Sequence, residues 1–165
     1  MRCYFLRHGI AVEPDEWKGR DFDRPLTPEG RRRMEREAST IADLSLGLDL
    51  IITSPLLRAR QTAEIVAERL GMIDRLLEDE RLGGGFGIAL LAPIIAAHKK
   101  AEALMFVGHE PSLGLTVGRL VGDARVEMKK GALAGVALGG ASAADGTLIC
   151  LIPPKALVRK KRGEP

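Results

Sequence analysis

Arginine and histidine side chains stand at the ends of apolar runs in this sequence. The first run ends at Arg7 and His8, and a later one ends at His109. Arg58 comes shortly after a third run. The planar fork of arginine matches the oxygens of a carboxylate or a phosphate. These residue types therefore indicate a site that holds one anion between guanidinium groups while an imidazole attacks or polarises it.

The elements that would position these side chains are strands alternating with helices. Apolar runs predict strands at residues 2–6, 49–53, 76–77 and 104–107. Helical spacing predicts helices from Pro28, with Thr27 as N-cap, and over residues 59–70, 88–100 and 112–120. Two later runs, 133–138 and 147–152, predict an antiparallel hairpin. We expect a three-layer α/β/α fold, with a mostly parallel central sheet, helices on both faces and an antiparallel edge.

The expected sheet explains how residues far apart in the sequence meet. Ligands of open α/β sheets bind at the carboxyl ends of the strands. Arg7, His8 and His109 all stand at such ends, and Arg58 follows another. We therefore expect the four side chains to share one edge of the sheet.

Length and composition favour a single folded domain. The chain has 165 residues, of which 45% are hydrophobic and only 4% aromatic. Such a chain can bury a core, which excludes a disordered protein, and it offers few surfaces on which bases could stack. The net charge of +3 comes from residues 155–165, which we expect to be a basic tail after a domain at 1–154. No nucleic-acid partner is expected.

The cysteines and the apolar runs bear on the cellular compartment. Cys3 and Cys150 both lie in predicted strands, so no disulfide is implied. No leader segment is recognisable, and no apolar run approaches the roughly 18 residues of a membrane span. We expect a cytoplasmic protein without a membrane partner.

Four short stretches resemble the histidine phosphatase superfamily, also called phosphoglycerate mutase-like, and within it the small SixA-type phosphohistidine phosphatases. They are Leu6-Arg7-His8-Gly9, Arg24-Pro25-Leu26-Thr27 with Gly30, the stretch from Ser54 to Thr62, and Val107-Gly108-His109-Glu110-Pro111. They occur in the family's order with matching gaps over residues 2–120. A lone Arg-His-Gly would be a weak signal, but the four together are specific.

The resemblance assigns a role to each matching residue. It implies that His8 is the nucleophile that becomes phosphorylated and that Arg7, Arg58 and His109 hold the phosphoryl group, joined by Arg24. It also implies catalysis without a metal or other cofactor. Nearby arginines would lower the pKa of His8 and favour its neutral, nucleophilic form.

Proton donation is the role with more than one interpretation. Glu80 is the nearest match to the carboxylic acid that many members use to protonate an ester leaving group. Glu80 could equally begin a loop. Phosphohistidine leaves as imidazole, which is far less basic than an alkoxide and needs no well-placed acid.

Three functions remain open. The first is a metal-independent phosphohistidine phosphatase acting on a histidine phosphotransfer or related signalling protein, which the short chain favours because it has little material for a lid. The second is a phosphomonoesterase for a small phosphate ester, in which Glu80 would matter. The third is a non-catalytic module that docks acidic partners through the basic tail.

Overall fold

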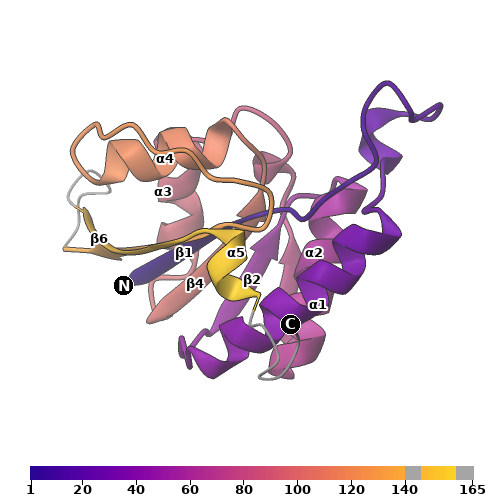
Figure 1. Ribbon diagram of the computed structural model, residues 1–165. Coiled ribbons are helices and arrows are strands. Elements are labelled where there is room, and N and C mark those ends of the chain that lie inside the picture. Colours follow the sequence, from indigo (N-terminus) through magenta and orange to yellow (C-terminus); the bar gives the residue numbers. More distant parts are fainter. Residues whose placement is uncertain (140–145, 159–165) are drawn as a thin grey trace.

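The computed structural model contains one six-stranded sheet between two layers of helices, and it describes residues 1–139 and 146–158 (Figure 1). The strands are β1 (Arg2–Arg7), β2 (Leu50–Thr53), β3 (Leu76–Glu78), β4 (Ala103–Gly108), β5 (Leu133–Leu138) and β6 (Gly146–Ile152). Their order in the sheet is β3-β2-β4-β1-β5-β6. The first four strands are parallel, whereas β5 runs antiparallel to β1 and β6 antiparallel to β5. This confirms the expected parallel sheet with an antiparallel edge.

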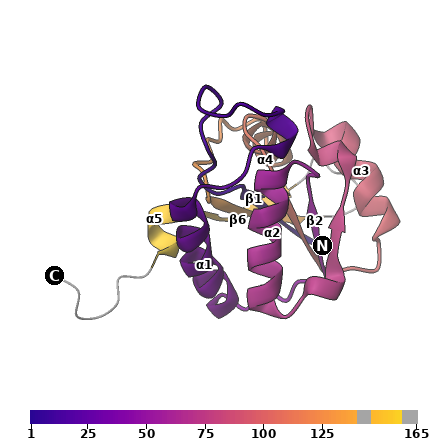
Figure 2. The same cartoon turned by 90° about the vertical axis from the view of Figure 1, so that its right-hand side faces the viewer.

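The helices cover both faces of the sheet. They are α1 (Pro28–Asp43), α2 (Leu57–Leu70), α3 (Ile88–Ala97), α4 (Ser112–Leu120) and α5 (Pro154–Leu157). Helices α1, α2 and α5 lie on one face, and α3 and α4 lie on the other (Figures 1 and 2). Each face buries its own cluster of largely aliphatic side chains. The three-layer α/β/α architecture is therefore confirmed.

The start of α1 follows from its local sequence. The Thr27 hydroxyl accepts a hydrogen bond from the Gly30 N–H at 2.9 Å, and Pro28 occupies the first helical position, where it has no N–H to satisfy. Gly30 then lies against the backbone of Ile10, because a Cβ on Gly30 would stand 2.0 Å from the Ile10 carbonyl oxygen. This close approach fixes α1 beside the segment that follows β1.

The C-terminal region differs from the expected domain boundary at residue 154. Residues 154–157 form α5, and Leu157 is buried in the same core cluster as the apolar face of α1. The folded part of the chain therefore extends through Lys155, which the composition had placed in the tail. The rest of the expected tail, residues 159–165, and the hairpin turn at 140–145 lie outside the described residues.

Several helix and strand ends differ by one to three residues from those expected. Helix α3 ends at Ala97 rather than at residue 100, while β2 begins at Leu50 and β4 extends to Gly108. Across residues 1–139 and 146–158, no helix is both long enough and apolar enough to cross a membrane.

Candidate active site

The carboxyl ends of β1, β2 and β4 meet at one edge of the sheet, as the topology requires. The His8 N–H donates to the Gly108 carbonyl at 3.0 Å, and the Ser54 N–H donates to the Val107 carbonyl at 3.0 Å. These bonds continue the pairing with β4 one residue beyond the ends of β1 and β2. They bring His8 and His109 together, with ring centroids 5.1 Å apart.

His8 is buried and its ring orientation is fixed. Its Nδ1 lies 2.8 Å from the Gly9 carbonyl oxygen. A carbonyl only accepts, so Nδ1 carries the proton and Nε2 keeps a lone pair. The Gly9 N–H in turn donates to the Thr62 hydroxyl at 3.0 Å, which ties this turn to α2. A neutral His8 in this position presents a nucleophilic Nε2.

The pKa of His8 lies well below its ordinary value of 6.5. Burial is the main cause, and the neighbouring His109 lowers it further. Arg58 and Arg7 also lower it, while the bond to Gly9 opposes the shift. The arginine effect expected from the sequence is present, but burial is the larger cause.

His109 is held by Ser54 at the end of β2. Its Nε2 lies 2.8 Å from the Ser54 hydroxyl oxygen, which also accepts a 3.2 Å bond from the Leu56 N–H. Burial, followed by the positive charge of Arg58, lowers the pKa of His109 to about 4. Both histidines of the site are therefore neutral near pH 7.

Each of the three arginines of the site donates to a backbone carbonyl, and two of them also donate to the carboxylate of Asp21. Arg7 donates from Nη1 to the Met128 carbonyl at 2.8 Å. Arg24 donates from Nε to Asp21 Oδ1 at 2.8 Å and from Nη1 to the Val12 carbonyl at 2.6 Å. Arg58 donates from Nη2 to Asp21 Oδ2 at 3.1 Å and from Nη1 to the Asp21 carbonyl at 2.9 Å. Asp21 thus joins two of the arginines.

Asp21 is a site residue that the sequence did not reveal. It stands in a single 3₁₀ turn, residues 21–23, three positions before Arg24. Burial alone would raise the pKa of its carboxyl, but Arg24 and Arg58 hold that pKa below its ordinary value. The acid three residues before Arg24 was the available signal, but its bond to Arg58 depends on the fold.

The described residues contain three buried side-chain nitrogens that have no hydrogen-bond partner. They are Nε of Arg7, Nε of Arg58 and Nδ1 of His109. Buried donors of this kind are costly unless something accepts from them. All three belong to residues predicted to hold the phosphoryl group. The three unpartnered nitrogens thus belong to residues that end or follow strands β1, β2 and β4 at the carboxyl edge of the sheet.

Glu80 is not part of this group. It begins a 3₁₀ turn, residues 80–82, after the edge strand β3, and its side chain is exposed. Within the described part of the chain, its carboxylate has no hydrogen bond or ion pair. It contributes to none of the shifted pKa values of His8, His109 or Arg58. Of the six predicted site residues, the structure links five and leaves Glu80 apart.

The described residues also contain no group of three or more His, Cys, Asp or Glu side chains arranged to hold a metal ion. The two cysteines are free, with Cys3 buried in β1 and Cys150 half-buried in β6.

The sequence is similar to one protein family and to a Picosynechococcus relative. A model of the histidine phosphatase superfamily (branch 1) matches residues 3–84. An uncharacterized protein of Picosynechococcus sp. (strain ATCC 27264 / PCC 7002 / PR-6) is 37% identical over 168 residues, covering 96% of this chain and 99% of the relative.

Solved structures give the same result. The protein histidine phosphatase SixA complexed with tungstate superposes with a TM-score of 0.83 and 25% identity, covering 95% of this chain and 99% of SixA. The α-ribazole phosphatase of Shigella flexneri superposes with a TM-score of 0.72 and 18% identity, covering 93% and 97% of the two chains. At that identity the second likeness shows a shared fold alone.

Proposed function

The chain belongs to the histidine phosphatase superfamily as a SixA-like phosphatase, and from this premise we propose that it removes the phosphoryl group from phosphohistidine side chains of other proteins. The single observation that carries the proposal is the set of buried, unpartnered nitrogens of Arg7, Arg58 and His109 beside a neutral His8. Such donors suit a group with several anionic oxygens, and a phosphoryl group is one.

His8 acts as the nucleophile. Its Nδ1 proton is held by the Gly9 carbonyl, so the lone pair of Nε2 attacks phosphorus. The bond from phosphorus to the substrate ring breaks and its electron pair stays on that ring, which leaves as neutral imidazole because its other nitrogen carries a proton. Water then attacks the phosphorylated His8, which releases inorganic phosphate and restores the lone pair on Nε2. The cycle uses no group beyond this chain, its substrate and water.

The arginines and His109 stabilise the charge that spreads over the phosphoryl oxygens. Arg7 and Arg58 each have a buried Nε–H available for this purpose. Ser54 can give its hydroxyl proton to His109 Nε2, since the hydroxyl oxygen already accepts from Leu56. His109 Nδ1–H is then a third donor. Arg24 acts beside them, joined to Arg58 through Asp21.

The position of Glu80 bears on the choice of substrate. An alkyl ester needs an acid to protonate its leaving alkoxide, whereas an imidazole leaves far more readily. The exposed, unbonded Glu80 side chain supports a substrate that needs no such acid. The likeness of the fold to an α-ribazole phosphatase keeps a small phosphate ester as the second candidate. In that reaction Glu80 would protonate the ester oxygen.

Replacing Glu80 separates the two candidates. We expect E80Q to hydrolyse free phosphohistidine at the wild-type rate, because its leaving imidazole needs no positioned acid. The measurement is the steady-state turnover of three substrates by wild type and E80Q: phosphohistidine, p-nitrophenyl phosphate and an alkyl phosphate. A collapse of phosphohistidine turnover in E80Q would contradict the proposal, and efficient alkyl phosphate turnover that depends on Glu80 would favour the ester.

Trapping the intermediate tests the chemistry itself. A histidine-phosphorylated protein labelled with ³²P is mixed with the enzyme and quenched in alkali within milliseconds. We expect an acid-labile label on His8, found by peptide mapping, and none on H8A. Labelling of another residue, or undiminished turnover by H8A, would sink the mechanism.

A further inference from the structure

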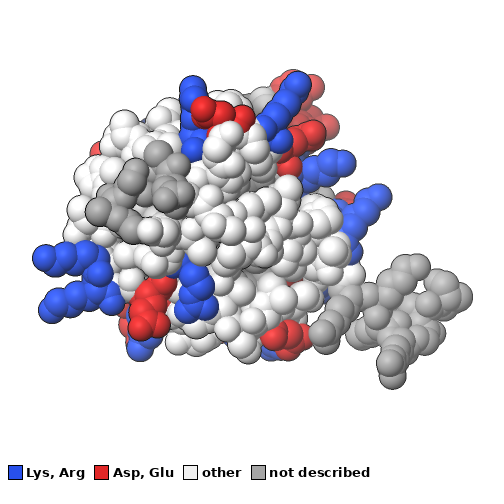
Figure 3. Space-filling view, turned by 90° about the vertical axis from the view of Figure 1, so that its left-hand side faces the viewer, with Lys and Arg blue, Asp and Glu red and all other residues white. Residues whose placement is uncertain are grey.

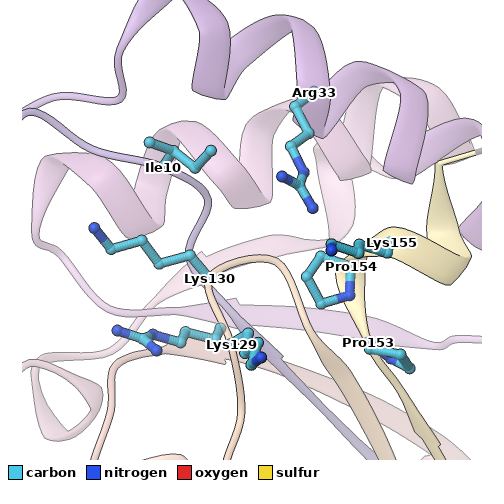
Figure 4. Close-up of a pocket in the computed structure, with 8 residues that line it drawn as sticks. Ile10, Arg33, Lys129, Lys130, Pro153, Pro154 and Lys155 are labelled. Carbon is cyan, nitrogen blue, oxygen red and sulfur yellow. The ribbon is translucent and has the colours of Figure 1, made fainter.

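A groove lined by basic side chains borders the site on the side of α1 and α5 (Figure 4). Its volume is about 450 Å³. Five of its eight lining residues are cationic and none is acidic; the eight are Arg7, Ile10, Arg33, Lys129, Lys130, Pro153, Pro154 and Lys155. We call it the basic groove. Two other hollows on the described surface have similar volumes, about 430 and 420 Å³, but acidic side chains line both of them.

The sheet topology places the basic groove next to the nucleophile. Because β5 is antiparallel to β1, its first residue Leu133 pairs with Leu6 near the carboxyl end of β1. The end of β6 is at the same edge, since Ile152 pairs with Leu133. The Gly131 N–H lies 3.1 Å from the Arg7 carbonyl and 3.2 Å from the His8 carbonyl. The segments before β5 and after β6 therefore both reach the candidate active site.

The basic groove is elongated. Figure 4 shows Ile10 and Lys130 at one end and Pro153 and Lys155 at the other, with Arg33 reaching in from α1 between them. A single phosphate would engage only part of such a row. An extended chain with several acidic side chains would engage most of it.

The charge of the basic groove is only partly compensated. Lys130 pairs with Glu13 at 2.8 Å, and Arg33 pairs with the buried Glu37 at 2.9 Å. Lys129 and Lys155 are exposed, and neither has an ion pair among the described residues. Two ammonium groups are thus free to meet an anionic partner.

The side of the molecule where β1 begins differs from the basic groove. That side has a broad centre without Lys, Arg, Asp or Glu, and its charged side chains lie around the rim (Figure 3). A charge surplus concentrated beside one site favours partners of the opposite charge and speeds their encounter.

We infer that the basic groove docks an acidic polypeptide segment flanking the phosphohistidine of the protein substrate. The inference rests on the proposed function. Lys129 and Lys155 meet carboxylates of the segment, while Ile10, Pro153 and Pro154 give its backbone and aliphatic stems an apolar surface. The basic groove selects substrates by the sequence around the phosphohistidine, and the site beside His8 carries out the chemistry.

Two phosphopeptides and one small substrate test the inference. Both peptides carry one histidine phosphorylated with phosphoramidate; in one it is flanked by Asp and Glu, in the other by Asn and Gln. Free phosphohistidine is the small substrate. The test variant is K129E/K155E, in which neither lysine belongs to the proposed catalytic group. The matched control is K99E/K100E, which makes the same charge change at exposed residues. They precede β4 and so lie near the amino end of that strand, away from the carboxyl ends where the basic groove lies.

We expect wild-type kcat/KM to be roughly tenfold higher for the acidic peptide than for the neutral one, with the advantage shrinking as salt is added. K129E/K155E should lose this preference through a higher KM and still hydrolyse free phosphohistidine normally. K99E/K100E should keep the preference, and circular dichroism checks that both variants fold.

Three results would overturn the inference, and they are distinguishable. Equal kcat/KM for the two peptides in wild type, with free phosphohistidine hydrolysed, would leave the proposed function standing and remove the docking role. An equal loss on free phosphohistidine in K129E/K155E would place the lysines at the phosphoryl site instead. No hydrolysis of any of the three substrates by wild type would sink the proposed function itself.

Discussion

His8 and His109 share a buried site in which a proton is unfavourable on either ring. Burial and Arg58 lower the pKa of His109 to about 4, and the pKa of His8 is also well below 6.5. We predict that neither ring takes up a proton as the pH falls from 8 to 5.5. Imidazole NMR, assigned with H8A and H109A, measures this. The same rings should titrate near 6.5 in urea, and titration of His8 above pH 6 in the folded protein would contradict the prediction.

Asp21 positions two arginines through one carboxylate. Its side chain is 60% exposed, yet it bonds Arg24 at 2.8 Å and Arg58 at 3.1 Å. We predict that D21N lowers kcat by roughly tenfold, the order expected from losing about one charge-assisted bond. Tungstate affinity should persist or increase, because a negative charge beside the arginines is gone. If Asp21 had only a structural role, D21N would lower kcat and tungstate affinity together.

D23N is the matched control for D21N, because Asp23 stands in the same 3₁₀ turn and its ion-pair partner among the described residues is the exposed Arg20. It should keep wild-type kcat. Equal losses in D21N and D23N would indicate that the turn as a whole, and not the Asp21 carboxylate, supports the site.

Among single residues, those that could be predicted from the sequence are reactive residue types next to the end of a predicted strand. His8 and His109 each stand next to glycine at the end of an apolar run, and the stretch around Arg58 is one of four motifs that are specific together. Asp21 has no such marker. Its carboxylate becomes part of the site only when α2 brings Arg58 to it from 37 positions away.

Gly30 lets α1 approach the segment after β1. A Cβ there would stand 2.0 Å from the Ile10 carbonyl oxygen, so either α1 or the turn after His8 would have to move. We predict that G30A lowers the free energy of unfolding by about 2 kcal/mol, as overpacking does, and lowers kcat through displacement of the turn. Urea unfolding and steady-state kinetics measure the two effects.

G84A is the control for G30A, since a Cβ on Gly84 would meet nothing within 4 Å. It should change neither stability nor kcat appreciably. A free energy of unfolding equal to that of wild type in G30A would mean that the backbone around Ile10 shifts at no cost in stability and that Gly30 does not fix the spacing of α1.

Elements with strong local signals were predictable, and those formed by distant packing were not. Thr27 and Pro28 mark the start of α1, and the apolar run of β4 is buried throughout. By contrast, Pro153-Pro154 and the basic residues after them predicted a tail. Leu157 nonetheless docks into the core cluster that includes the apolar face of α1, and this contact makes α5 part of the domain. A single apolar residue in a basic stretch does not reveal such docking.

On the scale of the whole molecule, the sheet gathers chemistry and charge at one edge. Strands β1, β2 and β4 bring the histidines and Arg58 there, and the antiparallel β5 and β6 bring basic segments to the same place. The net charge of +3 is uninformative by itself. Lys155, counted in the tail from composition, gains its significance only from α5 and the basic groove.

Glu37 adds a pH dependence to the stability of the whole fold. It is a buried carboxyl on α1, paired with Arg33 at 2.9 Å, and burial raises its pKa to about 7. The folded chain therefore binds this proton more tightly than the unfolded chain does. Its contribution to stability is complete below about pH 4.5 and is lost as the pH rises through 7.

His8 and His109 act in the opposite direction, because the folded chain binds their protons less tightly and loses stability as the pH falls below 6.5. The two effects partly cancel in the wild type.

We predict that E37Q removes the effect of Glu37, so that the stability advantage of wild type over E37Q shrinks by at most about 3 kcal/mol between pH 4.5 and 8. Urea unfolding at a series of pH values gives the difference directly, and E35Q, at an exposed position on the same helix, should show a far smaller change. A difference between wild type and E37Q that stays constant with pH would mean that Glu37 remains charged in the folded protein, held by Arg33 against the cost of burial.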